Sequence, residues 1–229
     1  MFKQFGHGTV DNFGNAEFTV AQSGQLDTLT ALERIGTRRT FTRDEEIYGE
    51  GAAADCWFMV VSGTVRICKL LADGRRHIAE FCFSGDCFGL DNATERQVSA
   101  EAVGAVTVMR YSRRATERLI EEIPSLARQI CDITLRDLAH AQSHMLLLSR
   151  MTAPERVAAF LLELSERRDA RRALEVPMSR TDIADYLGLT IETVCRVLSV
   201  FKREGWIAFS DPHRIELCDR AALAEMCEA

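Results

Sequence analysis

The chain has 229 residues, enough for one or two domains that each bury a core. Its hydrophobic share of 47% and charged share of 27% exclude wholesale disorder. The net charge of −6 excludes nucleic-acid binding by bulk positive charge, although one domain could still carry a local binding surface. The longest apolar run, residues 56–61, is too short to span a membrane, and the N-terminus lacks a secretory signal pattern. We therefore expect a cytoplasmic protein that does not contact a membrane.

The first part of the chain combines an irregular start with a β-rich region. Residues 1–22 show no sustained periodicity and predict a flexible arm. From about Arg38, short apolar runs are separated by glycines spaced 12, 11 and 11 residues apart, which is typical of an antiparallel sandwich or roll. The run 57–67 is rich in β-branched and aromatic residues, and residues 72–74 (Ala-Asp-Gly) supply a hairpin turn.

After Arg113 the periodicity is helical. Six uncharged positions are spaced 3, 4, 3, 4 and 3 residues apart: Cys131, Thr134, Leu138, Ala141, Met145 and Leu148. A helix with such a stripe either packs on its own domain or pairs with a second copy across a two-fold axis. We favour pairing, because no buried charge would oppose it, and expect these six residues to form a dimer interface.

A new helix is predicted to begin at Thr152, because residues 152–155 (Thr-Ala-Pro-Glu) have the form of a capping box with proline in the first turn. The helix would end in the charged run 166–172, which is either a solvated linker or a phosphate-contacting segment.

Residues 179–204 have the pattern of a helix-turn-helix. Ser179 is placed to cap a short helix, Gly188 ends it, and Thr190 caps a second helix from Ile191 to about Glu204. The second helix is expected to bury Val194, Val197, Leu198 and Phe201. Alternating residues 206–209 and 214–217 then predict a hairpin that completes a winged helix, and Asp219 could cap a last short helix.

The exposed face of the second helix suits contact with DNA bases. Arg196 can donate two hydrogen bonds to guanine, Glu192 can accept from a base amino group, and Ile191 could contact a thymine methyl. Because Glu192 and Arg196 are four residues apart, we expect each to orient the other. Charges between residues 179 and 204 balance to zero, so affinity would depend on hydroxyls, helix N-termini and dimerisation. The expected backbone contacts are Ser179, Arg180, Thr190, Thr193, Ser199 and Arg203.

Three strings of the sequence carry a family resemblance. Residues 182–198 (DIADYLGLTIETVCRVL) are similar to the helix-turn-helix of the Crp/Fnr transcription regulators. Residues 85–91 (GDCFGLD) and 99–102 (SAEA) resemble the β-roll of the FixK-type branch. The resemblance covers about residues 38–224 and implies an α+β fold with four parts. These are an arm (1–22), a cyclic-nucleotide-binding-like antiparallel β-roll (23–122), a dimerisation helix (123–150) and a winged helix-turn-helix (151–229).

The same resemblance implies a dimeric, sequence-specific DNA-binding regulator and not an enzyme. Its double-stranded DNA target would be a palindromic promoter site with TTGA-type half-sites. The protein would act with RNA polymerase, mostly as an activator of microaerobic or nitrogen-fixation genes. The family's base-contacting positions fall on Ile191, Glu192, Cys195 and Arg196. The third of these is usually serine in the oxygen-responsive branches, so Cys195 is a departure.

The sequence predicts no cofactor and no metal. Nucleotide-binding relatives place a Glu after the Phe-x-Gly turn and an Arg–Ser pair shortly beyond, whereas this chain aligns Leu90 and Val98-Ser99 there. A buried phosphate without a charged partner would be costly. An iron–sulfur cluster would need four converging thiolates, and residues 1–55 contain no cysteine. Haem is poorly supported, because His77 is a lone candidate.

Two modes of control remain open. The protein could be a constitutively competent dimer, or the thiol of Cys195 could act as a redox switch, since oxidation beside DNA would add bulk and charge. In the alternative reading, Cys195 is only a small spacer. Two functional alternatives also remain: an effector-gated regulator whose β-roll binds an unidentified small ligand, and a cysteine enzyme, for which no Cys–His–Asn/Asp set can be placed.

Overall fold

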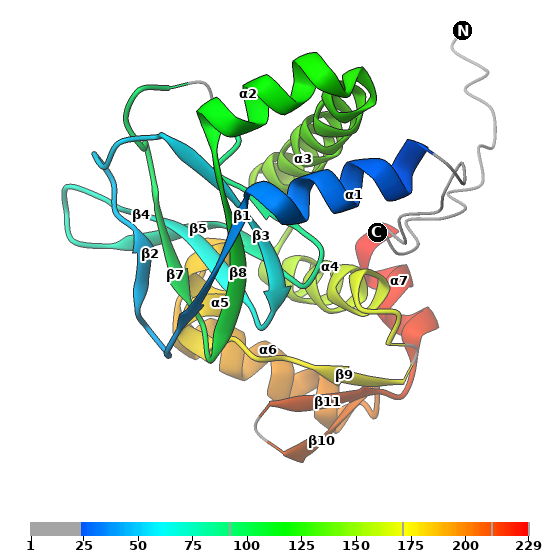
Figure 1. The fold of residues 1–229 in the computed structure, drawn as a ribbon. Coiled ribbons are helices and arrows are strands. Elements are labelled where there is room, and N and C mark those ends of the chain that lie inside the picture. The colour runs from blue at the N-terminus through cyan, green and yellow to red at the C-terminus, as the bar shows by residue number, and fades with distance from the viewer. Residues whose placement is uncertain (1–23, 92, 171, 212, 229) are drawn as a thin grey trace, which may run out of the picture.

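The computed structural model describes residues 24–91, 93–170, 172–211 and 213–228, so the expected arm at 1–22 lies outside the described residues. A β-roll is followed by two helices and then by a smaller helical part with its own three-stranded sheet (Figure 1). No helix in the described part of the chain is both long and apolar enough to cross a membrane.

The β-roll consists of two antiparallel four-stranded sheets. One has the order β1 (Gly36–Phe41), β8 (Val106–Ser112), β3 (Cys56–Ser62), β6 (Cys87–Phe88). The other has the order β2 (Glu46–Tyr48), β7 (Ser99–Ala102), β4 (Val65–Leu70), β5 (Arg76–Cys82). Apolar residues from both sheets, among them Phe58, Val65 and Val108, share one core between them.

Turns divide the β-rich region as the glycine spacing predicts. The run 57–67 forms two strands rather than one, because Gly63 turns the chain with φ +90°. A Cβ at Gly63 would collide with the Ala105 carbonyl oxygen, so only glycine fits. Strands β4 and β5 pair as a hairpin around the predicted turn at Asp73-Gly74.

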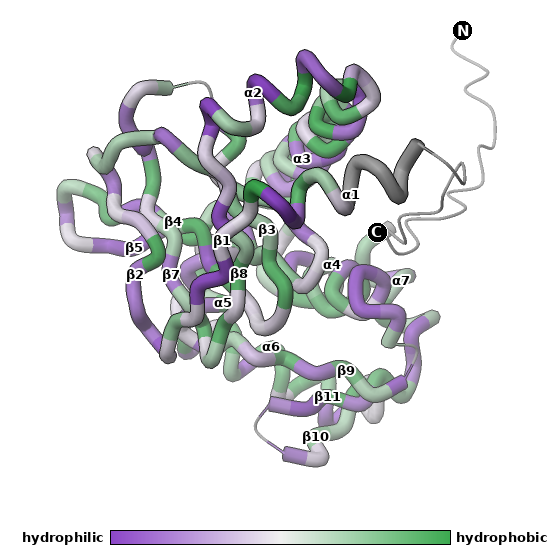
Figure 2. Tube along the Cα trace, in the orientation of Figure 1, coloured by the Kyte–Doolittle hydropathy of each residue, from purple (hydrophilic) through white to green (hydrophobic). Residues whose placement is uncertain are grey.

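Three helices cover one end of the roll. They are α1 (Gly24–Ile35), which the sequence did not predict, α2 (Arg113–Glu122) and α3 (Pro124–Arg150). Leu32, Leu119 and Leu126 pack with Trp57 and Tyr111 of the roll. Hydrophobic and hydrophilic residues alternate along α2 and α3 (Figure 2), and Pro124 starts α3 in a new direction.

The C-terminal part begins with α4 (Ala153–Arg167), whose predicted Thr152–Glu155 capping box is present. It continues with β9 (Ala173–Glu175), α5 (Arg180–Leu187), α6 (Ile191–Arg203), β10 (Ile207–Asp211), β11 (Arg214–Leu217) and α7 (Arg220–Glu228). The predicted wing hairpin is β10–β11, and β9 adds a third strand that was not expected. The Asp219 carboxylate accepts a hydrogen bond from the Ala222 N–H at 3.0 Å and so caps α7.

The charged run 166–172 is not a fully solvated linker. Arg167 is half-buried, and its guanidinium donates to the Asp86 carboxylate at 2.6 Å and to the Phe81 carbonyl at 3.2 Å. Arg168 pairs with Glu175 at 2.9 Å. The prediction of a solvated linker was wrong for Arg167. Its partners lie more than 80 residues away in the sequence, so the local pattern gave no sign of them.

Candidate nucleic-acid interface

Helix α5 is fixed at both ends by local chemistry. At its start, the Ser179 hydroxyl accepts from the Asp182 N–H at 3.1 Å, and the Asp182 carboxylate accepts from the Ser179 N–H at 3.0 Å. This reciprocal capping box satisfies two backbone donors that the helix itself leaves free. At its end, Gly188 adopts the left-handed conformation with φ +62°. The chain therefore leaves α5 in a tight turn and starts α6 three residues later.

Helix α6 buries one face and exposes the other. Thr190 caps it by accepting from the Thr193 N–H at 3.3 Å. The predicted inward residues Val194, Val197, Leu198 and Phe201 are all buried. Ile191, Glu192, Cys195 and Arg196 are all exposed and lie within the first two turns; we call these four residues the recognition face. The structure thus places together every residue that was predicted to contact bases.

Contacts on the recognition face differ from prediction in one respect. The Arg196 guanidinium donates to the Thr193 hydroxyl at 3.4 Å instead of pairing with Glu192. The Glu192 carboxylate accepts from its own backbone N–H and from the Thr190 hydroxyl, which lowers its pKa. The expected mutual orientation of Glu192 and Arg196 was therefore wrong, because the N-terminal backbone donors of α6 attract the carboxylate more strongly.

The predicted backbone-contacting residues come from α5, α6 and their N-caps, and most of them are exposed. Ser179, Thr190, Ser199 and Arg203 are exposed, and Thr193 is half-buried. The half-buried Arg180 stacks on the Phe209 ring, with 5.2 Å from its guanidinium carbon to the ring centroid. Arg180 thereby joins α5 to the wing.

The uncharged stripe on α3 is uncovered in the single chain. Cys131, Thr134, Leu138, Ala141 and Met145 are exposed, and Leu148 is half-buried. Leu138 is 53% exposed and Met145 is 62% exposed. Next to the stripe lies an open, largely apolar groove of about 440 Å³, lined in part by His77, Met145 and Leu148. An exposed apolar stripe of this kind is typical of a surface that a partner covers.

Sequence reasoning missed a buried arginine in the roll. The side chain of Arg96 is only 1% exposed. Its guanidinium donates to the Gly89 carbonyl at 2.9 Å, to the Asp91 carboxylate at 2.8 Å and to the Cys56 carbonyl, and it stacks on the Tyr48 ring. No signal in the sequence indicates that Arg96 is buried, because the groups that bind it come from separate segments of the chain.

The cysteines do not converge. Cys56, Cys68 and Cys82 are buried, whereas Cys131, Cys195 and Cys218 are exposed. The described part of the chain contains no group of three or more His, Cys, Asp or Glu side chains arranged to hold a metal ion.

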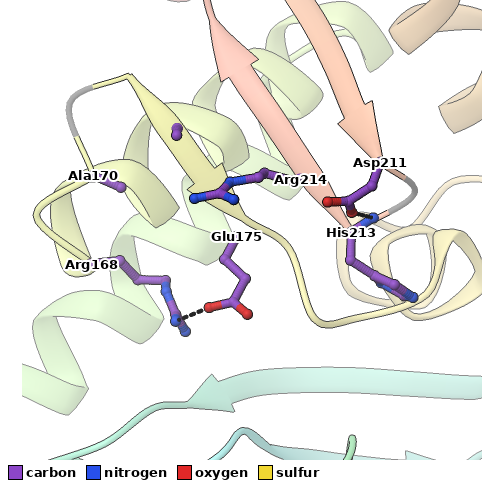
Figure 3. Close-up of a pocket in the computed structure, with 7 residues that line it drawn as sticks. Arg168, Ala170, Glu175, Asp211, His213 and Arg214 are labelled. Atoms are coloured by element: carbon purple, nitrogen blue, oxygen red, sulfur yellow. Dashed lines mark hydrogen bonds and ion pairs between the residues drawn. The ribbon is translucent and has the colours of Figure 1, made fainter.

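A second hollow lies beside the wing rather than on the recognition face. It has a volume of about 390 Å³ and is lined by Arg168, Glu175, Asp211, His213, Arg214 and two alanines (Figure 3). Within it, Arg168 and Glu175 pair at 2.9 Å, and the Asp211 carboxylate accepts from the His213 N–H at 2.8 Å. These pairs satisfy local charges and do not involve α6.

Two domain families and several known proteins match the chain. The descriptions that match are a Crp-like helix-turn-helix domain over residues 155–226 and a cyclic nucleotide-binding domain over residues 38–123. The nitrogen fixation regulation protein FixK of Azorhizobium caulinodans is 43% identical over 197 residues, which cover 84% of this chain and 79% of that protein. FixK of Bradyrhizobium diazoefficiens is 41% identical over 211 residues, covering 86% and 89%.

The fold is also similar to that of a solved FixK structure. The structure of FixK2 from Bradyrhizobium japonicum superposes with a TM-score of 0.80 at 42% identity and covers 85% of this chain and 98% of that one. The roll, the long helix α3 and the winged helix-turn-helix occur here in the order that the two domain matches require. The chain therefore belongs to the Crp/Fnr family of DNA-binding transcription regulators, a family that includes its FixK relatives.

Proposed function

We propose that two copies of this chain bind a palindromic DNA site with TTGA-type half-sites, and that Glu192 and Arg196 of each copy contact bases in the major groove. The observation that carries this proposal is the joint exposure of the recognition face on the first two turns of a capped helix. The planar guanidinium of Arg196 matches the O6 and N7 acceptors of guanine, and Ile191 suits a thymine methyl.

The rest of the binding surface follows from the same orientation. Ser179, Arg180, Thr190, Thr193, Ser199 and Arg203 contact the sugar–phosphate backbone, which sets position rather than sequence. The α3 stripes of two copies pair across the two-fold axis and hold the two α6 helices about one helical turn of DNA apart. The exposed Leu138 and Met145 support this pairing.

The protein acts as an activator that contacts RNA polymerase, with genes of nitrogen fixation or microaerobic growth among its targets. This part of the proposal rests on the printed names of its relatives. Three are nitrogen fixation regulation proteins called FixK, and another is the transcriptional activatory protein AadR of Rhodopseudomonas palustris.

No cyclic nucleotide is needed for activity. The phosphate of such a ligand requires an available buried cation. Arg96 is the buried arginine on the loop that follows Phe88-Gly89. Its two terminal nitrogens are already bound by the carbonyls of Gly89 and Cys56 and by the Asp91 carboxylate, which leaves only Nε without a partner among the described residues. Leu90 supplies no polar group for a ribose. These residues do not fit a cyclic nucleotide, which supports effector-independent binding over a ligand-gated β-roll.

The thiol of Cys195 adjusts DNA binding. Cys195 is exposed on the recognition face, next to Arg196. Oxidation of this thiol adds oxygen atoms, and further oxidation adds negative charge, where the DNA would lie.

A binding titration tests base contact by Arg196. The parent protein and Arg196→Ala are titrated against the palindrome and against the same DNA with both guanines changed. Loss of a bidentate arginine–guanine contact costs about 1–3 kcal/mol per half-site, so Arg196→Ala should lose the discrimination between the two DNAs. The control Arg203→Ala should weaken binding to both DNAs and lower the salt dependence, as expected for a phosphate contact.

Two results would contradict the proposal. If Arg196→Ala discriminates as well as the parent, α6 does not contact the guanines. If the parent binds the palindrome only after addition of cyclic AMP, the protein is effector-gated.

A further inference from the structure

An ion-pair cluster joins the β-roll to the helix-turn-helix. It consists of Arg66 on β4 and Arg76 on β5, facing Asp182 and Asp185 on α5; we call these four residues the junction cluster. Arg66 Nη1 lies 3.2 Å from Asp182 Oδ1, and Arg76 Nε lies 2.9 Å from Asp185 Oδ2. Arg76 Nη2 also donates to Asp182 Oδ1. The paired residues are 106 to 116 positions apart in the sequence, so the cluster connects two separate parts of the fold.

The centre of the junction cluster is buried. The side chains of Arg66 and Asp182 are 7% and 4% exposed, and those of Arg76 and Asp185 are 26% and 22% exposed. Arg66 also pairs with Asp44 at 2.9 Å and with Glu101 at 2.6 Å, so several acceptors satisfy its guanidinium. Buried ion pairs add little net stability, because desolvation offsets their attraction, but they penalise any arrangement in which a partner is lost. The cluster therefore favours one orientation of α5 on the roll.

Asp182 transmits this orientation to the start of α5. Its Oδ2 atom accepts from the backbone N–H and the hydroxyl of Ser179 at 3.0 and 2.7 Å, while its Oδ1 atom accepts from the two arginines. One carboxylate thus caps the helix and ties that cap to the roll. Helix α5 packs against α6, and only three residues separate them, so the placement of α5 determines that of α6.

Aromatic contacts support the same placement. Tyr186 of α5 packs on Phe81 of β5, with ring centroids 5.2 Å apart, and stacks on His144 of α3 at 4.1 Å. Figure 1 shows α5 directly under the strands of the roll. In this docked arrangement the recognition face remains exposed. The contact therefore positions α6 without covering it.

We propose that Arg66 and Arg76 are positioning residues for DNA recognition, which hold each α6 at the angle and separation that the palindrome requires. The inference rests on the proposed function. It adds that charges within the chain, and not a bound ligand, set the orientation of the α6 helix in each copy. Loss of either arginine should let the helix-turn-helix swivel on the roll, so that half-sites at other spacings become better targets.

The test compares DNA spacings. The parent, Arg76→Gln and Asp185→Asn are titrated against the palindrome and against versions with one base pair inserted or removed between the half-sites. That change moves one half-site by about 3.4 Å and about a tenth of a turn. Both variants should bind the original spacing about tenfold more weakly and should lose most of the preference for it. Arg76→Lys, which keeps the charge but not the planar fork, should recover only part of the preference.

The neighbouring residue provides a matched control. Arg75 lies on the same hairpin and pairs with the exposed Asp73 at 2.7 Å, so Arg75→Gln should keep the spacing preference of the parent. Arg76 and Asp185 are partly exposed, so these variants should fold, and near-ultraviolet circular dichroism checks this.

The outcomes separate the two proposals. If the variants lose affinity equally at every spacing, the cluster only stabilises the fold and the positioning role is wrong. Unchanged binding would also overturn it. If the parent itself fails to distinguish the palindrome from DNA with both guanines changed, the proposed function fails, and the positioning role fails with it.

Discussion

Burial divides the cysteines into two chemical groups. Burial in the roll raises the pKa of Cys68 to about 11 and that of Cys87 to about 12, and it raises the pKa of Cys82 well above its ordinary value. Only the thiolate reacts rapidly with oxidants, so these residues are inert at neutral pH. Cys195 is exposed and lies on the recognition face, which makes it the cysteine where oxidation would most directly affect DNA.

Oxidation should therefore weaken DNA binding through Cys195. A mild oxidant such as hydrogen peroxide should raise the Kd of the parent for its palindrome, and a reductant should reverse the change as long as oxidation stops at the sulfenic acid or a disulfide. Cys195→Ser keeps a small polar group and should bind equally well before and after treatment. Cys218→Ser removes another exposed thiol, which is not part of the recognition face, and should stay as sensitive as the parent. Equal loss in Cys195→Ser and the parent would place the sensitive group elsewhere.

Arg96 shows what a residue-level pattern cannot reveal. Its neighbours Glu95 and Gln97 are exposed, and the three residues look like an ordinary polar loop in the sequence. Its burial depends on Gly89, Asp91 and Cys56, which only the folded roll brings to one place. The sequence aligns Val98 with the arginine of nucleotide-binding relatives, so we expect no nucleotide-binding arginine at that position. The structure adds an arginine nearby whose two terminal nitrogens bind groups of the protein itself, while its buried Nε has no hydrogen-bond partner among the described residues.

At the scale of single elements, the sequence predicted both helices of the helix-turn-helix and the hairpin of the wing. Capping residues at Ser179 and Thr190, a glycine at 188 and a clean buried stripe fix the two helices of the helix-turn-helix by local rules. Helix α1 and strand β9 were missed, since a helix with weak periodicity and a three-residue strand exist through packing and pairing with distant segments.

The stripe on α3 carries the prediction that belongs to this scale. Leu138 is 53% exposed in the single chain and would face its copy near the two-fold axis. Leu138→Glu would place two like charges together in an apolar interface, so sedimentation should show monomers at concentrations where the parent is dimeric. Ser143→Glu adds the same charge to an exposed position of α3 off the stripe and should leave the dimer intact. A Leu138→Glu protein that remains dimeric would show that pairing uses another surface.

At the scale of the whole molecule, charges from three parts of the fold meet at one place. Glu163 of α4 contacts His140 of α3, and Arg167 of α4 pairs with Asp86 of the roll at 2.6 Å. Together with the junction cluster, these contacts join the roll, the long helix and the DNA-binding part. No local pattern could predict them, because each charge looks like an ordinary surface residue until the elements are packed together.

Glu80 of β5 lies beside this meeting point and should make stability depend on pH. Burial raises its pKa from 4.5 to about 7, and the carboxylates of Asp137 and Asp86 add to the shift, while Arg167 and His140 oppose it. Between pH 4.5 and 7 the folded protein therefore keeps a proton that the unfolded chain has lost. The contribution of Glu80 to the free energy of unfolding is constant at lower pH, falls as the pH rises through this window, and stays low above pH 7.

Glu80→Gln, which resembles the protonated form of Glu80, should remove the part of the fall in the free energy of unfolding that Glu80 causes between pH 4.5 and 7. Relative to the parent, the variant should have a similar free energy of unfolding at about pH 4.5 and should be more stable by about 3 kcal/mol at about pH 8, as measured by urea denaturation. Glu117→Gln alters an exposed carboxylate on α2, and its free energy of unfolding should differ from that of the parent by the same small amount at both pH values.

The neighbouring His140 has a raised pKa, chiefly through its contact with Glu163, so the contribution of His140 to the free energy of unfolding also falls as the pH rises. Because Glu80→Gln leaves that contact in place, the variant should retain a weaker decline of stability with pH. If Glu80→Gln and the parent instead show parallel pH profiles, the carboxyl of Glu80 is ionised in the folded protein throughout, and the meeting point of the three parts is more open to water than its packing indicates.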